Sequence, residues 1–138
     1  MKGGEITLGQ IGQGSDVVYA AAGGTGVGVL QTAADNGIFS IGVDSNQNYL
    51  HPGSVLTSML KRVDNATYEV FSAGVDGFEA GINVMNLEAE GVGYAVDEHN
   101  EALITDDMRA AVEEAKAKII SGEIMVHDYT SDDSCPVM

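Results

Sequence analysis

Two short apolar runs, joined by a glycine-rich turn and one helical pattern, constrain the fold of this chain more than any other feature. The first run, residues 17–22, is followed at once by glycines, and the second, residues 38–43, stops at Asp44. Between them apolar residues recur at helical spacing until Asn36 and Gly37, a pair that often ends a helix. Strand, helix and strand over this length predict a parallel, right-handed βαβ unit with buried strands.

A third strand and a second helix are predicted directly after this unit. Residues 55–60 form another apolar run, and Lys61 stands at its end. Apolar side chains then recur from Val63 to Phe71 at the spacing of one helix face, which predicts a helix that lasts until Gly74. The parallel arrangement would place the ends of all three strands at one edge of the sheet.

The C-terminal half predicts shorter elements. Residues 83–87 and 92–96 are expected to form short strands. A last helix is expected to begin after Thr105, which is a good N-cap residue, and to be closed by Gly122.

The composition indicates one domain. The chain has 138 residues, of which 44% are hydrophobic and 20% charged, as is typical of a globular protein. We expect a single α/β lobe over residues 1–126 and a loose polar tail over residues 127–138. The formal net charge of −15 argues against a nucleic-acid partner, because an acidic protein repels phosphate groups. No apolar run reaches the length of a transmembrane helix, and we expect no signal peptide after Met1.

Four residues are candidates for ligand binding. Gly23 and Gly24 lie where a strand enters a helix, so the loop either approaches a ligand through its backbone or forms a tight turn. Asp44 ends a buried strand, where its carboxylate could accept two hydrogen bonds from vicinal hydroxyls, as in a ribose, or could simply serve a turn. Lys61 stands at the same edge, either beside a ligand or as a solvated lysine.

Metal, cofactor and nucleophile chemistry find little support in the sequence. His51, His99 and His127 do not pair with one another or with Cys135 at metal-ligand spacing, so we expect no metal site and no cofactor. Ser58 and Cys135 have no evident base partner. A small α/β enzyme that uses Asp44 as a base remains an alternative, as does a structural or regulatory domain without a ligand.

Four segments resemble one family: residues 16–26 (DVVYAAAGGTG), 41–47 (IGVDSNQ), 52–64 (PGSVLTSMLKRVD) and 119–124 (IISGEI). They are similar to the basic membrane protein family of substrate-binding lipoproteins, which serve ABC transporters and include purine nucleoside receptors. The resemblance implies a type I periplasmic-binding-protein fold, in which two α/β lobes close on a ligand. This chain would be the three-layer C-terminal lobe with a parallel sheet, incomplete at its N-terminus.

The resemblance also implies roles for the candidate residues. The turn of Gly23 and Gly24 would lie beside a purine nucleoside such as adenosine, inosine or guanosine. Asp44 would hold the ribose hydroxyls, and Lys61 would reach the sugar. The full-length protein would be non-catalytic, anchored outside the cytoplasm and partnered by an ABC permease. The lobe alone would bind weakly or not at all, and we expect it to form a homo-oligomer through an uncovered sheet edge.

Overall fold

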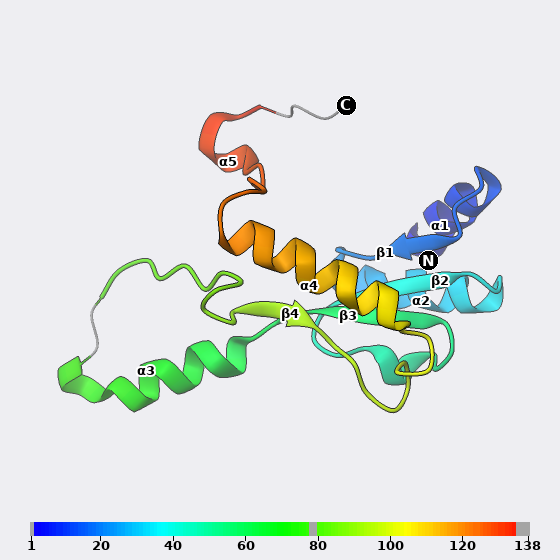
Figure 1. Cartoon of the computed structure of the whole chain (residues 1–138). Helices are drawn as coiled ribbons and strands as arrows, with labels where there is room; N and C mark the ends of the chain where they lie inside the picture. Colours follow the sequence, from blue (N-terminus) through cyan, green and yellow to red (C-terminus); the bar gives the residue numbers. More distant parts are fainter. Residues whose placement is uncertain (1, 78–79, 135–138) are drawn as a thin grey trace. The chain divides into compact units, whose positions relative to one another are not determined.

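The computed structural model describes residues 2–77 and 80–134, which fall into two units. The first unit is Met1–Thr105 and the second is Asp106–Met138. Figure 1 labels the helices and strands of the chain.

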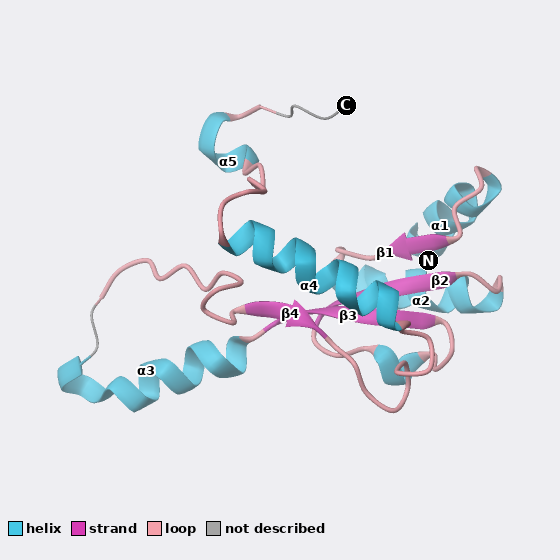
Figure 2. Ribbon diagram, viewed as in Figure 1, coloured by secondary structure: helices cyan, strands magenta, loops and turns pink. Residues whose placement is uncertain are grey.

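The predicted strands form a four-stranded sheet with the order β1-β2-β3-β4 (Figure 2). The first three are parallel: β1 (Val17–Tyr19), β2 (Phe39–Asp44) and β3 (Val55–Lys61). The fourth, β4 (Val92–Tyr94), pairs antiparallel with β3. The α/β class is therefore confirmed, but the sheet is mostly rather than wholly parallel.

The βαβ unit is present, with a shorter first strand than predicted. The helix α2 (Gly26–Asp35) connects the parallel strands β1 and β2. β1 has three residues, because the N–H of Ala22 turns back to the carbonyl of Ala20 at 2.8 Å. A short 3₁₀ helix, η1 (Gly23–Thr25), then leads into α2.

The expected strand at residues 83–87 does not form among the described residues. Asn86 instead closes a turn: its carbonyl accepts from the N–H of Gly91 at 2.9 Å, and its Oδ1 accepts from the N–H of Ala89 at 3.0 Å. Asparagine side chains that bond to the nearby backbone favour turns over strands. The strand predicted at residues 92–96 is confirmed in part, as β4.

The core of the first unit lies between α2 and the sheet. Leu30 and Ala33 of α2 are 0% exposed, as is Val55 of β3. Val27, near the start of α2, is 45% exposed. The helix α1 (Lys2–Gly12) packs on α2 at Gly3, where a Cβ atom would lie 2.8 Å from the carbonyl oxygen of Thr25. That position therefore requires glycine.

The second predicted helix is confirmed, but its apolar stripe is exposed. The helix α3 (Val63–Gly77) follows β3, and Gly74, with a φ of 65°, interrupts its helical geometry where the sequence predicted the end. Val63, Val70 and Phe71 are 67%, 47% and 80% exposed. The spacing of these residues thus predicted the helix correctly, although the stripe covers no core among the described residues.

The second unit contains the last predicted helix, α4 (Asp106–Ile120). The N–H of Gly122 bonds to the carbonyl of Ile119 at 3.1 Å, which agrees with its predicted role in closing the helix. Within the polar tail a short helix, α5 (Tyr129–Asp132), begins at Asp128, whose side chain caps it. Residues 135–138 of the tail, Cys135 included, lie outside the described residues. None of the described helices is long and apolar enough to cross a membrane.

Candidate functional site

The carboxyl edge of the sheet brings two of the four candidate residues into direct contact. Asp44 pairs with Leu60 across β2 and β3, so Asp44 and Lys61 end neighbouring strands. The Nζ of Lys61 lies 2.6 Å from Oδ1 of Asp44. The two side chains are 58% and 48% exposed, respectively, so the ion pair is open to solvent. The prediction that both residues stand at this edge is confirmed.

The electrostatics of the pair keep the lysine charged. The hydrogen bond from Lys61 to Asp44 and the negative charge of Asp44 raise the pKa of Lys61 above its ordinary value. Partial desolvation opposes this rise, and Tyr19 adds to it. Tyr19 is the last residue of β1 and is 53% exposed, so it contributes a phenol at the same edge. The sequence analysis did not select Tyr19, because an aromatic residue in an apolar run suggests packing.

The backbone at Asp44 is unusual. Asp44 has a φ of 72°, in the left-handed region of backbone conformation that residues other than glycine seldom adopt. The N–H of Ser45 bonds to the carbonyl of Val43 at 3.0 Å, so Asp44 is the central residue of a tight turn. Such backbone strain persists only where the surroundings hold it, and it often marks functional sites. The turn role and the ligand role considered for Asp44 are therefore compatible.

The two glycines follow the neighbouring strand β1. Tyr19 is in register with Ile41, so the chain after β1 leaves the sheet at the same edge as Asp44. Gly23 has a φ of 51°, which explains glycine at this position, and both Gly23 and Gly24 are exposed. A Cβ atom at either would meet open space, so packing within the chain does not require glycine there.

A polar network fixes the loop that follows Asp44, and the sequence analysis did not find it. Ser58 of β3 is 0% exposed; its Oγ donates to Oδ1 of Asn48 at 2.8 Å and accepts from the N–H of Gln47 at 2.9 Å. Oδ2 of Asp97 accepts from Nδ2 of Asn46 at 2.5 Å and from Nδ2 of Asn48 at 3.1 Å. These bonds lower the pKa of Asp97, Asn46 making the largest contribution.

Asp97, Glu98 and His99 follow β4, and one potential metal-ligand atom from each lies within 4.8 Å of the others. They are consecutive residues, and the carboxylate of Asp97 already accepts hydrogen bonds from Asn46, Asn48 and the N–H of His99. Exposed acidic groups commonly gather in this way without an ion. This cluster therefore carries no metal assignment.

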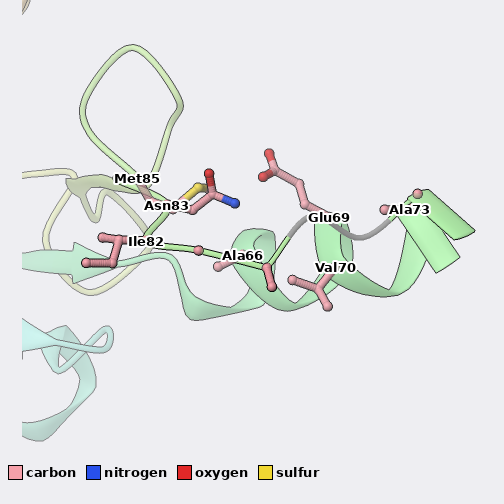
Figure 3. A pocket seen from close by; sticks show the side chains of 10 residues that line it. Ala66, Glu69, Val70, Ala73, Ile82, Asn83 and Met85 are labelled. Carbon is pink, nitrogen blue, oxygen red and sulfur yellow. The ribbon is translucent and has the colours of Figure 1, made fainter. Parts of the chain in front are cut away.

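A separate pocket of about 510 Å³ opens between α3 and the segment that follows it (Figure 3). Its lining includes the apolar residues Val70, Ile82 and Met85 and the polar residues Glu69 and Asn83. None of the four candidate residues lines it. The pocket and the Asp44–Lys61 edge are thus distinct features of the first unit.

Comparisons with known proteins agree on one family. The family described as "ABC transporter substrate-binding protein PnrA-like" matches residues 2–130. The chain is 34% identical over 145 residues to the ABC transporter nucleoside-binding protein BmpA of Lactococcus lactis subsp. cremoris, covering 91% of this chain and 40% of that protein. It is 36% identical over 93 residues to basic membrane protein D of Borreliella burgdorferi, covering 62% of this chain and 27% of that protein.

A solved structure shows the same fold. The crystal structure of an ABC transporter solute-binding protein from Aeropyrum pernix K1 matches with a TM-score of 0.74 and 30% identity, over 95% of this chain and 46% of that one. The chain therefore spans less than half the length of each of these three proteins.

Proposed function

The chain belongs to the family of PnrA-like substrate-binding proteins of ABC transporters, and from this premise we propose that it supplies the sugar-binding edge of a purine nucleoside receptor. The family predicted from the four sequence segments is confirmed. The proposal goes further, because it assigns a ligand class, adenosine, inosine or guanosine, and a role to named residues. The contact between Asp44 and Lys61 at the exposed carboxyl edge is the observation that carries it.

The chemistry of this pair suits a ribose. The carboxylate of Asp44 has two oxygens, and hydrogen bonds to an ionised acceptor are stronger than those between neutral groups. Oδ1 is engaged by Lys61, and the pair is exposed enough for vicinal hydroxyls to approach. Lys61 donates to a sugar oxygen while it keeps Asp44 in place. The open backbone at Gly23 and Gly24 lets the ligand approach the neighbouring strand end.

We propose that binding by this chain alone is weak. Receptor pockets typically enclose about 70–90% of a small ligand, whereas Asp44 and Lys61 remain about half exposed. Water competes for every hydrogen bond at such an edge. We expect dissociation constants of about 1 mM or weaker, which correspond to roughly 4 kcal/mol of binding free energy.

The test is saturation-transfer NMR on the chain with adenosine, 2′-deoxyadenosine and adenine. A sugar site predicts transfer to adenosine, less transfer to the deoxy compound and little to the free base. Asp44→Ala is expected to abolish transfer to adenosine. Asp16→Ala is the matched control, because it removes the same charge from an exposed residue just before β1, at the opposite end of that strand. Equal transfer to adenine and adenosine, or retained transfer in Asp44→Ala, would contradict the proposal.

We propose that the site is non-catalytic. Two of the relatives are named as nucleoside-binding and solute-binding proteins, and the lysine that contacts Asp44 is a hydrogen-bond donor that can hold the carboxylate in place. Chromatography of the same nucleoside samples separates this proposal from the alternative of a small α/β enzyme. Turnover that depends on Asp44 would support the enzyme, and no response to any nucleoside would support a structural or regulatory domain.

From the family we also propose where the receptor is located and which protein it delivers its ligand to. A full-length receptor of this family would be anchored outside the cytoplasm and would deliver its ligand to an ABC permease. If a permease gene lies beside the gene for this protein, its affinity-tagged product should retain the protein from detergent extracts, and it should not retain an unrelated binding protein. Failure of this capture with a folded, ligand-loaded receptor would count against the permease partner.

Self-association is a further part of the proposal. β1 is an outer strand of the sheet, and its residues Val17 and Tyr19 are 39% and 53% exposed. Unpaired strand edges recruit other strands. Light scattering should therefore show a homo-oligomer, and a stable monomer at high concentration would contradict this expectation.

A further inference from the structure

We infer that Asp97 is a positioning residue for Asp44, because its carboxylate anchors the loop on which the shape of the sugar-binding edge depends. The inference rests on the proposed function, since it adds a residue that acts on the same site. Asp97 follows β4 and lies outside the four segments that indicated the family.

Both carboxylate oxygens of Asp97 are used. Oδ2 accepts two bonds from the loop after Asp44, from Nδ2 of Asn46 at 2.5 Å and from Nδ2 of Asn48 at 3.1 Å. Oδ1 accepts from the N–H of His99 at 2.8 Å, within its own turn. Because an ionised acceptor makes the stronger hydrogen bonds, one side chain links two segments 51 residues apart in sequence.

Asp97 is itself held firmly. Its N–H donates to Oδ1 of Asn100 at 2.8 Å. Asn100 is 1% exposed, and its Nδ2 donates to the carbonyls of Leu56 at 2.8 Å and Ala95 at 2.9 Å. The turn that carries Asp97 is thereby fastened to β3 and to the residue after β4. A side chain anchored in this way can restrain the loop that it bonds to.

The restraint reaches Asp44 from both sides. On the C-terminal side, Asn46 and Asn48 are bonded to Asp97. On the N-terminal side, the N–H of Val43 donates to Oε1 of Gln47 at 2.9 Å. Asp44 lies between them with its φ of 72°, a conformation that relaxes unless neighbouring segments hold it. Release of the loop would therefore move the carboxylate of Asp44 away from Lys61.

A positioning role differs measurably from a general structural role. Loss of a structural residue loosens the entire first unit, whereas loss of Asp97 should loosen the loop alone. Amide hydrogen exchange resolves the two, because local opening and global unfolding affect different amides. The amides of Val43 and Gln47 report on the loop, and that of Leu30, in the buried face of α2, reports on the fold.

The experiment compares Asp97→Ala and Asp97→Asn in the ¹⁵N-labelled chain by NMR. In Asp97→Ala, exchange at Val43 and Gln47 should become about tenfold faster, with a clearly smaller increase at Leu30. In Asp97→Asn the remaining oxygen still accepts from Asn46 and Asn48, so exchange should return most of the way to the original rates. Glu98→Ala, the adjacent acidic residue with an 80% exposed side chain, is the charge-matched control and should change neither rate.

A second readout follows the ion pair itself. In Asp97→Ala the pKa of Lys61 should fall toward its ordinary value of 10.5, because the displaced carboxylate of Asp44 no longer bonds to it. Titration of the labelled lysine side chains measures this change. Asp97→Asn should keep the raised pKa of Lys61.

Three results would overturn the inference: unchanged exchange at Val43 and Gln47 in Asp97→Ala, an equal increase at Leu30, or the same response in Glu98→Ala. Should Asp97→Ala fail to fold, Asn46→Ala at an exposed position removes one of the two loop bonds to Asp97, together with the bond that Oδ1 of Asn46 accepts from the N–H of Asn48, and the same criteria apply to a rise of about threefold. The exchange data need no ligand. Absence of nucleoside binding in the unmodified chain would therefore refute the proposed function without altering this test.

Discussion

Two fully buried serines on neighbouring strands offer a matched test of what holds the loop after Asp44. Ser40 of β2 and Ser58 of β3 are both 0% exposed. The Oγ of Ser58 bonds to Oδ1 of Asn48 at 2.8 Å and to the N–H of Gln47 at 2.9 Å. The Oγ of Ser40 has no hydrogen-bond partner among the residues that the structure describes. Replacement by alanine removes the same atom in each case, so any difference reflects the partners.

The expected effects have opposite signs. Ser58→Ala leaves the buried Oδ1 of Asn48 and the N–H of Gln47 without a partner, and an unsatisfied buried group costs about 1–3 kcal/mol. We therefore expect the free energy of unfolding to fall by about 2 kcal/mol. With a shift of roughly 4 °C per kcal/mol, the melting temperature should fall by about 8 °C. Ser40→Ala removes a hydroxyl that is buried without a bond, and should raise the free energy of unfolding by about 0–1 kcal/mol.

Urea unfolding followed by circular dichroism measures both variants against the unmodified chain. Equal slopes of free energy against urea would show that only stability has changed. A loss in Ser40→Ala as large as that in Ser58→Ala would refute the reasoning, because it would mean that the loss comes from packing and not from the hydrogen bonds. A neutral Ser58→Ala would refute it equally.

Three further outcomes follow from the structure. The lowered pKa of Asp97 means that its contribution to stability is complete above its ordinary pKa of 3.8 and is lost as the pH falls through the lower folded value. Asp64 and Asp128 also have lowered pKa values, so acid titration of unfolding should show a smaller loss of stability in Asp97→Asn than in the unmodified chain. Leu30→Ala should lower the free energy of unfolding by about 2–5 kcal/mol in urea, because the side chain is 0% exposed in the core. Gly42→Ala should lower it by about 1–3 kcal/mol, and a thermal melt checks this, because the added Cβ would lie 2.8 Å from Oε1 of Gln47 and from Oγ of Ser58.

The ends of β2 and β3 were predictable from the sequence because their apolar runs stop at charged side chains, whereas the run that contains β1 passes into glycines and did not predict where that strand ends. Asp44 and Lys61 close two such runs, and β2 and β3 end at these residues. Their direct contact was not predictable, because it depends on a register that shifts between Ser40 and Ile41. Helical spacing likewise predicted α3, but spacing reveals only that a helix has an apolar face and not what covers it.

The restraint on Asp44 was missed for a physical reason. Asp97 and Asn46 are bonded although they lie 51 positions apart in sequence. Neither residue belongs to a motif or a periodicity that would indicate this bond. Asparagine and aspartate in polar segments ordinarily indicate turns, and both do lie in turns here. Their pairing arises only when the antiparallel β4 brings the following turn beside the loop, and the sequence analysis expected a parallel sheet.

The ion pair at the sheet edge could be read as evidence against a ligand, since Lys61 already neutralises Asp44. The geometry argues otherwise. An ion pair that serves stability gains little at a solvated edge, where water screens both charges. Asp44 nevertheless adopts a left-handed backbone, with a polar network on either side, to hold its carboxylate there. The left-handed conformation serves the tight turn that follows β2. The proposed function adds a second role for it, because the turn keeps the carboxylate oriented and accessible, and a sugar diol requires both of its acceptor.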